Sequence, residues 1–337
     1  MHLVGLLLLW PACLTAQVTR PAMPDSVREY VRTAMELFRQ RSVHRDSVDW
    51  TALEDSVLAR AANAQVPADT WLALSWAFRS VDRHSFLQPP MDRIGQMLGV
   101  AAPEIPRRAP RVPTSQHLAG GIGLVTVPGH GGPNRPEYVD SLQTQLARLD
   151  SAGVCGWVVD LRENTGGNMW PMLAGLGPLL GGEVVGSFSP GEPEAAWRYR
   201  EGRSWYGDSI MPAEPVGWGR VRPRDLEHAD APVALLLGKQ TASSGEMVVI
   251  AFQGRPNTRS FGDSTAGFAS ANSTVPLRDG AMLVVTSSYP RDRHGRAYPL
   301  RLGPDELVPS SEGVSADAPL ARAVTWLRDE QACRGRQ

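Results

Sequence analysis

One stretch of the sequence, residues 156–168, reads Gly-Trp-Val-Val-Asp-Leu-Arg-Glu-Asn-Thr-Gly-Gly-Asn. Its first half is a continuous apolar run without polar alternation, which is typical of a strand buried on both faces. Residues 232–237 form a second run of this kind, and residues 244–253 follow it with the pattern of a helix. Buried strands that alternate with helices favour an α/β domain with a largely parallel sheet.

The same alternation extends over the carboxyl-terminal two thirds of the chain. Strands are predicted over 122–127 and 282–286, and a helix over 137–150, where apolar residues recur at helical spacing. We place this α/β domain at 117–332 and expect residues 186–230, which are rich in Gly, Pro and Trp, to form an insertion.

The amino-terminal part of the chain has a different pattern. Apolar residues recur at spacings of three and four over 24–63, with a second helix predicted at 51–63 and a third at 68–80. Residues 101–116 contain four prolines and no apolar period, so they read as a linker. We therefore expect a small helical region over 24–100, ahead of the α/β domain.

The composition excludes some classes of function. The chain has 337 residues, of which 42% are hydrophobic, so a large core can be buried. The formal net charge is -1, which leaves no basic excess to neutralise phosphates, and no nucleic-acid partner is expected. Lys239 is the only lysine in the sequence, so a mechanism that needs a catalytic lysine has one candidate.

Residues 1–16 have the form of a secretory signal, because a short apolar run over 3–9 precedes small residues that end at Ala16. The predicted location is therefore secreted or periplasmic, with no integral membrane segment after cleavage. A lipoprotein signal through Cys13 is less favoured, since Trp10 stands where an aliphatic residue is usual.

Cleavage leaves two cysteines, Cys155 and Cys333. In an exported protein they could pair, or Cys155 could be a buried free thiol, and the sequence leaves both alternatives open. Neither the cysteines nor the histidines have the spacing of metal ligands, so no metal and no cofactor are expected.

Chemistry is expected at two strand-to-helix junctions. At the first, Gly166 and Gly167 leave backbone amides unobstructed, and such amides can stabilise an oxyanion; the alternative is a glycine-rich turn without a ligand. At the second, Ser243 and Ser244 lie where a buried strand meets a helix, and the alternative there is an ordinary helix cap. No G-x-S-x-G elbow is present at this junction, which disfavours an α/β-hydrolase esterase or lipase.

Five ordered segments strengthen the catalytic interpretation. They are Asp160-Leu161-Arg162-x-Asn164-x-Gly166-Gly167, Thr241-Ala242-Ser243-x-x-Glu246, Gly262-Asp263-x-Thr265-Ala266-Gly267, Leu277-x-Asp279-Gly280 and Gly303-Pro304-Asp305. Their order and spacing resemble those of the S41 serine peptidases, which comprise the tail-specific (carboxyl-terminal processing) enzymes and their tricorn-like relatives. The resemblance covers about residues 118–310, and its last segment is shortened.

This resemblance implies a ClpP/crotonase-like α/β fold. It also implies that Ser243 is the nucleophile. The oxyanion hole would then combine the amide of Gly166 or Gly167 with that of Ser243 itself or of Ser244.

The sequence departs from the tail-specific branch in two ways. The lysine that activates the serine in that branch would fall at Phe268, and Lys239, before Ser243 at the end of the incoming strand, is disfavoured as the base. The linker also leaves no room for the PDZ domain that is usual in that branch.

The tricorn-like branch fits better, because Asp82-Arg83-His84-Ser85 looks like its Asp-x-His-Ser segment. That likeness makes His84 the general base and Ser85 a group that orients it. The orienting carboxylate stays open between three candidates, Glu246, Asp305 and Glu306. We expect the other histidines of the mature chain to lie at the surface: His44, His117, His130, His228 and His294.

Together these features predict an exported serine peptidase that cleaves peptides or unfolded proteins with a serine activated by histidine. The alternative is a protein of the same fold that has lost catalysis and binds a peptide or a small apolar ligand.

Overall fold

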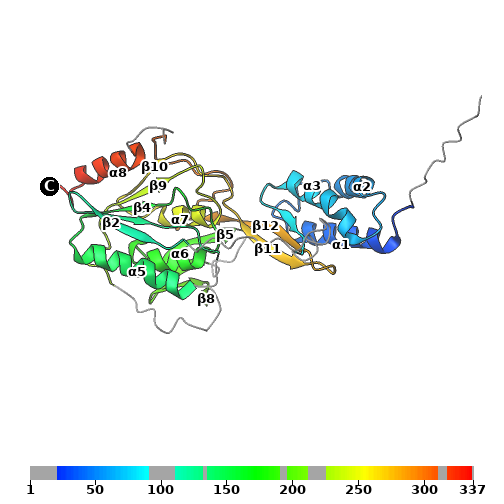
Figure 1. Ribbon diagram of the computed structural model, residues 1–337, viewed down its shortest axis with the longest axis horizontal. Coiled ribbons are helices and arrows are strands. Elements are labelled where there is room, and N and C mark those ends of the chain that lie inside the picture. Colours follow the sequence, from blue (N-terminus) through cyan, green and yellow to red (C-terminus); the bar gives the residue numbers. More distant parts are fainter. Residues whose placement is uncertain are drawn as a thin grey trace, which may run out of the picture.

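Two lobes joined by a narrow neck make up the computed structural model of the chain (Figure 1). It describes residues 21–90, 111–131, 135–189, 196–211, 225–309 and 317–335, so the predicted signal at 1–16 lies outside the described residues. Its elements are α1 (Asp25–Arg41), α2 (Trp50–Arg60), the 3-10 helix η1 (Pro67–Thr70), α3 (Trp71–Val81), β1 (Phe86–Gln88), β2 (Thr114–Leu118), β3 (Ile122–Thr126), α5 (Arg135–Ser151), β4 (Gly156–Asp160), α6 (Met169–Leu176), the 3-10 helix η2 (Gly177–Leu179), β5 (Val184–Ser189), β6 (Ala196–Arg200), β7 (Arg203–Tyr206), β8 (Ser209–Met211), β9 (Val233–Leu237), α7 (Ser244–Phe252), β10 (Thr258–Gly262), β11 (Ala271–Pro276), β12 (Met282–Arg291), β13 (Glu306–Leu307) and α8 (Ala318–Asp329).

A six-stranded sheet forms the centre of the larger lobe, in the order β13-β10-β9-β4-β3-β2. All its pairings are parallel except that of β2 with β3. This confirms the predicted α/β class with a largely parallel sheet. Because β4 and β9 are parallel neighbours, with Asp160 beside Leu236, the two junctions singled out in the sequence follow at the same edge of the sheet.

Helices cover both faces of this sheet, which explains why its central strands β4 and β9 are apolar and buried. Side chains of α5, α6 and α7, such as Leu142, Leu173 and Val248, form one core with the strands. On the other face, Ala323 and Leu327 of α8 pack in a second core (Figure 1). Continuous apolar runs, rather than alternating ones, are what such a two-sided environment selects.

A disulfide between Cys155 and Cys333 ties the segment after α8 to the residue before β4. It spans 178 residues of sequence and is buried beside Leu327. Of the two alternatives that the sequence left open, the structure contains the paired cysteines.

The smaller lobe consists of α1, η1, α2 and α3, packed on the outer part of the β11–β12 hairpin (Figure 1). Its core includes Leu277, Ala281, Leu283 and Val285 of that hairpin, and β1 pairs antiparallel with β12. We call α1–α3, η1, β1 and this part of the hairpin the helical unit. It therefore contains residues far apart in the sequence.

The hairpin also connects the two lobes, because β12 continues into a second, antiparallel sheet of order β1-β12-β5-β6-β7-β8, with β11 on β12.

The domain boundaries predicted from the sequence differ in detail from those of the structure. Residue Thr114, at the start of β2, falls inside the predicted linker over 101–116, of which residues 101–110 lie outside the described residues. No helix in the described ranges combines the length and apolarity that a membrane crossing needs.

Asp279, at the turn of the hairpin, holds the helical unit in place. Its Oδ2 accepts hydrogen bonds from Tyr30 Oη at 3.0 Å and from Trp71 Nε1 at 2.9 Å, and its Oδ1 accepts from the N–H of Ala281 at 3.1 Å. Tyr30 lies on α1 and Trp71 begins α3, so one carboxylate joins two helices to the hairpin.

We expect Asp279→Ala to lower the free energy of unfolding by about 2 kcal/mol or more, because it leaves two mostly buried donors without a partner. Chemical denaturation followed by tryptophan fluorescence measures this loss. Asp46→Ala is the matched control, since Asp46 is 89% exposed in the same lobe and should change little. Equal stability of the two variants would contradict the assigned role.

Candidate active site

Ser243 lies between the end of β9 and the first residue of α7, in a backbone conformation that non-glycine residues rarely adopt. Its φ is 52° and its ψ is -118°, a strained geometry that the surrounding structure must maintain. The preceding turn is bonded to the segment after β4. The N–H of Ala242 donates to the carbonyl of Asn164 at 2.9 Å, and Thr241 Oγ1 donates to that of Leu161 at 2.8 Å.

Glu246, on the first turn of α7, has a fully buried carboxylate. It accepts four hydrogen bonds: from the N–H of Ser243 at 2.8 Å, from Thr265 Oγ1 at 2.5 Å, and from the N–H groups of Gly267 and Phe268 at 3.0 and 2.7 Å. None of these partners is a histidine. Glu246 therefore holds the serine turn and the loop over 265–268, instead of contacting the proposed base.

The paired glycines lie directly against the serine turn. Gly166 and Gly167 have φ values of 97° and 116°, and a Cβ on Gly166 would stand 2.9 Å from the Cβ of Ser243. The N–H of Gly166 donates to Asn164 Oδ1 at 3.0 Å, and Ser244 Oγ donates to the carbonyl of Gly167 at 2.6 Å. These contacts explain why both positions are glycine.

Two of the four candidate oxyanion amides already have partners, those of Gly166 and Ser243. Among the described residues, no hydrogen bond uses the N–H of Gly167 or of Ser244. Backbone N–H groups without a partner at the start of a helix are suited to bind an oxyanion.

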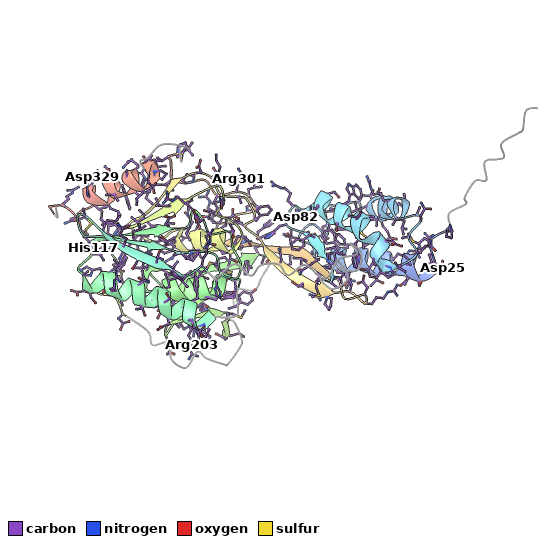
Figure 2. The ribbon with its side chains drawn as sticks, in the orientation of Figure 1. Asp25, Asp82, His117, Arg203, Arg301 and Asp329 are labelled. Carbon is purple, nitrogen blue, oxygen red and sulfur yellow. A yellow bond between two sulfur atoms is a disulfide. The ribbon has the colours of Figure 1, made fainter. Side chains whose placement is uncertain are left out.

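His84 lies in the short segment between α3 and β1. Its Nδ1 is 2.7 Å from Ser270 Oγ, and its ring centroid is 5.3 Å from that of Phe268. Burial lowers the pKa of His84 below its ordinary value of 6.5, and the negative charge of Asp82 opposes this shift. Asp82, labelled at the neck in Figure 2, accepts the N–H of His84 at 2.8 Å.

Ser85 has a different partner from the one that the sequence suggested. It is fully buried, and its Oγ accepts the N–H of Thr286 on β12 at 2.9 Å. The hydroxyl beside the imidazole belongs instead to Ser270, which sequence reasoning missed. No motif pointed to Ser270, because it lies 186 residues from His84 in the chain.

The loop over 265–270 connects the two halves of the site. Its first part binds the Glu246 carboxylate, through which it is joined to Ser243. Its last part contacts His84 through Phe268 and Ser270. The structure thus brings Ser243, Ser244, Glu246 and both glycines into direct contact, and it connects His84 to them through this loop.

The remaining candidates lie elsewhere. Asp305 binds the N–H and Oγ of Ser260, and Glu306 pairs with Arg322 at 2.5 Å, so neither carboxylate contacts His84. Lys239 is exposed on the turn after β9.

The surface placement expected for His130 is wrong, since this residue is only 4% exposed. Its ring packs on Tyr138 with centroids 4.6 Å apart, and its carbonyl accepts the N–H of Asn168 at 2.7 Å. The neighbouring glycines allow this approach, because a Cβ on Gly129 would stand 2.5 Å from the carbonyl oxygen of Gly166. His130 therefore packs against the turn that contains Gly166 and Gly167.

The other four histidines differ in exposure. His117 and His294 are exposed, as predicted. His44 and His228 are half-buried, and each lies beside a carboxylate. His44 Nε2 is 3.5 Å from Asp82, and His228 Nδ1 is 2.9 Å from Asp150.

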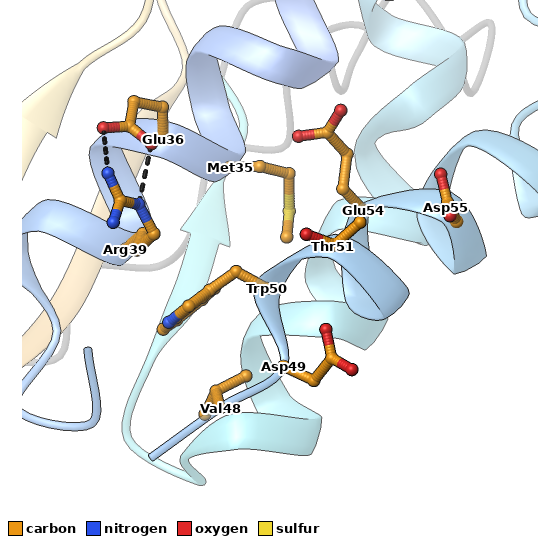
Figure 3. A pocket seen from close by; sticks show the side chains of 9 residues that line it. All are labelled: Met35, Glu36, Arg39, Val48, Asp49, Trp50, Thr51, Glu54 and Asp55. Carbon is orange, nitrogen blue, oxygen red and sulfur yellow. Dashed lines mark hydrogen bonds and ion pairs between the residues drawn. The ribbon is translucent and has the colours of Figure 1, made fainter. Parts of the chain in front are cut away.

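One cavity lies next to the candidate catalytic residues, and another lies away from them. One, of about 610 Å³, is lined by His84 and by part of the loop over 265–270. The other, of about 520 Å³, lies between α1 and α2 in the helical unit, where Glu36 and Arg39 pair at its rim (Figure 3). Only the first contains a candidate catalytic residue. No group of metal-binding side chains is arranged to hold an ion within the described ranges.

Several known proteins are similar to this chain in sequence or in fold. The nisin-resistance protein of Lactococcus lactis subsp. lactis is 26% identical over 323 residues, which cover 91% of this chain and 89% of that protein. The structure of a lipoprotein from Streptococcus agalactiae superposes with a TM-score of 0.67 at 23% identity, covering 96% of this chain and 99% of that one. The photosystem II D1 C-terminal processing protease superposes with a TM-score of 0.57 at 14% identity, covering 84% and 93%.

The profile of Peptidase family S41 matches residues 121–308, which contain both junctions, the loop over 265–270 and the hairpin. This match covers more than half of the chain and confirms the resemblance drawn from the five motifs. The fold likeness to a C-terminal processing protease agrees with it. The chain therefore belongs to peptidase family S41.

Proposed function

We propose that this chain is an exported serine peptidase in which Ser243 is the nucleophile and His84 is the general base. The proposal is carried by one observation: the loop over 265–270 contacts both halves of the site. It donates hydrogen bonds to Glu246, which also binds the N–H of Ser243, and it contacts the His84 imidazole. A strained serine at a helix start, free amides beside it and a half-buried imidazole are the groups that acyl transfer requires.

In this mechanism His84 donates its Nδ1–H to Ser270 Oγ, which leaves the Nε2 lone pair for the serine proton. Ser243 Oγ attacks the peptide carbonyl, and the amides of Gly167 and Ser244 stabilise the oxyanion. The imidazolium then returns the proton to the leaving amine. Water, activated by the same imidazole, hydrolyses the acyl-enzyme and regenerates the serine.

We expect Ser243→Ala and His84→Ala each to reduce peptide hydrolysis by a factor of about a thousand or more, because nucleophile and base act as one unit. Cleavage of casein by the purified mature chain measures the loss. Labelling by a fluorophosphonate probe reports serine activation independently, and it should also fail in both variants.

His294→Ala is the control for the histidine substitution, since His294 is exposed in a hairpin turn. Cleavage that survives Ser243→Ala would overturn the proposed mechanism. If the unmutated chain neither cleaves nor takes up the probe, the alternative of a binding protein without catalysis replaces it.

The lowered pKa of His84 predicts the pH dependence. The neutral imidazole is the active base, and a lowered pKa keeps it neutral in more acidic solution, so the acid limb of kcat/KM should have its midpoint below pH 6.5. Asp82→Asn removes the charge that raises this pKa and should move the limb to still lower pH. A shift to higher pH, measured with a fluorogenic peptide, would contradict the assignment.

A second candidate function is resistance to nisin. It comes from the relative in Lactococcus lactis, whose alignment covers 91% of this chain and so extends beyond the α/β lobe. Expression of the exported chain in a nisin-sensitive host should then raise the inhibitory concentration of nisin, and Ser243→Ala should abolish the effect. Protection that persists in Ser243→Ala would point to binding rather than hydrolysis.

A further inference from the structure

The cavity beside His84 lies at the junction of the two lobes. It is lined by residues 81–84, from the end of α3 and the segment that follows it, and by residues 266–270 and 299–301 of the α/β lobe. Its volume of about 610 Å³ is large enough for more than one amino-acid side chain. A substrate held at the proposed base would therefore extend into this space.

Apolar side chains cover part of its surface. Phe268 is half-buried with its ring beside His84, and Leu300, which also lines the cavity, is 74% exposed. An exposed leucine next to a candidate catalytic group is suited to contact an apolar ligand group.

Two guanidinium groups flank the same segment. Arg83 lies across the Phe268 ring, with its Cζ 5.5 Å from the ring centroid. Arg301 lies beside Gly267, since a Cβ added to this glycine would stand 3.3 Å from the Cβ of Arg301. The Nη2 of Arg301 is 3.4 Å from the carbonyl oxygen of Ala266. The two arginines thus reach the cavity from opposite lobes, next to adjacent residues of one loop. Figure 2 labels Arg301 on the α/β lobe, close to the neck.

The carboxylate that lines the cavity already has partners within the protein. Asp82 is its one lining carboxylate, and it accepts bonds from Thr286 Oγ1 and the N–H of His84 and lies 3.5 Å from His44 Nε2. In the described part of the chain, no ion pair includes Arg83 or Arg301. The cavity therefore presents two unneutralised cations above an apolar surface.

We propose that this cavity is a substrate subsite that binds a carboxylate within a few residues of the scissile bond, with Arg83 and Arg301 as the residues that determine specificity. The inference rests on the proposed peptidase function and names the substrate class for it. A guanidinium binds a carboxylate through paired N–H donors, and the apolar surface takes a neighbouring aliphatic or aromatic side chain. The carboxylate is either the free carboxyl terminus of the substrate or an Asp or Glu side chain.

The experiment uses a quenched fluorogenic peptide built around a cleavage site mapped in casein. Three forms separate the sources of the carboxylate: a free carboxyl terminus, an amidated terminus, and an amidated terminus with Asp in place of Asn near the scissile bond. We expect the unmutated chain to prefer one carboxylate form in kcat/KM over its neutral counterpart.

Arg83→Gln and Arg301→Gln should each reduce that preference, expressed as the ratio of the two kcat/KM values, by about tenfold, the size expected for one charge-assisted hydrogen bond. Arg83→Lys should retain part of the preference because it keeps the charge. Arg328→Gln is the matched control, since Arg328 is exposed on α8, at the far end of the α/β lobe, and should leave the ratio unchanged (Figure 1).

Equal cleavage of all three forms by the unmutated chain would overturn the subsite and leave the peptidase proposal intact. So would a preference that survives both Gln substitutions. If no form is cleaved, the peptidase proposal fails, and fluorescence anisotropy of the labelled peptides with Ser243→Ala decides the subsite. A carboxylate preference in binding that both Gln substitutions remove would support it, and equal binding of all forms would overturn it.

Discussion

The structure of the site depends on one buried carboxylate, that of Glu246. An ionised carboxylate inside a protein is costly unless hydrogen-bond donors replace the water it has lost. Here three backbone amides and the hydroxyl of Thr265 do so, and they come from the serine turn and from the loop over 265–268. The strained Ser243 and Phe268 are therefore linked by the same interaction, because the N–H of each donates to one carboxylate.

The same loop explains how two lobes contribute to one site. The loop over 265–270 ends where β11 begins, and β11 leads into the hairpin whose turn residue, Asp279, anchors α1 and α3. His84 follows directly after α3, and β1 then pairs with β12. A continuous series of packed elements thus runs from Glu246 through the hairpin to His84, so the orientation of the lobes and the geometry of the candidate base are coupled.

Most of the fold could be predicted from the sequence. The strands at 156–160 and 233–237 followed from uninterrupted apolar runs, and the motif order identified the family that the profile confirms. Other features could not be predicted, because their partners are distant in the chain. Ser270 lies 186 residues from His84, Asp279 lies 249 residues from Tyr30, and His130 is buried where its glycine-flanked loop packs on the paired glycines.

By itself the sequence determined the class of fold, the family and the identity of the serine turn, since apolar periodicity, paired glycines and short motifs act over a few residues. Only the tertiary structure decided which groups contact one another: that Glu246 holds the loop rather than His84, that Ser270 and not Ser85 lies at the imidazole, and that the two cysteines pair. Hydrogen bonds between distant segments depend on how the sheet and hairpin position them, and no local pattern of residues encodes that geometry.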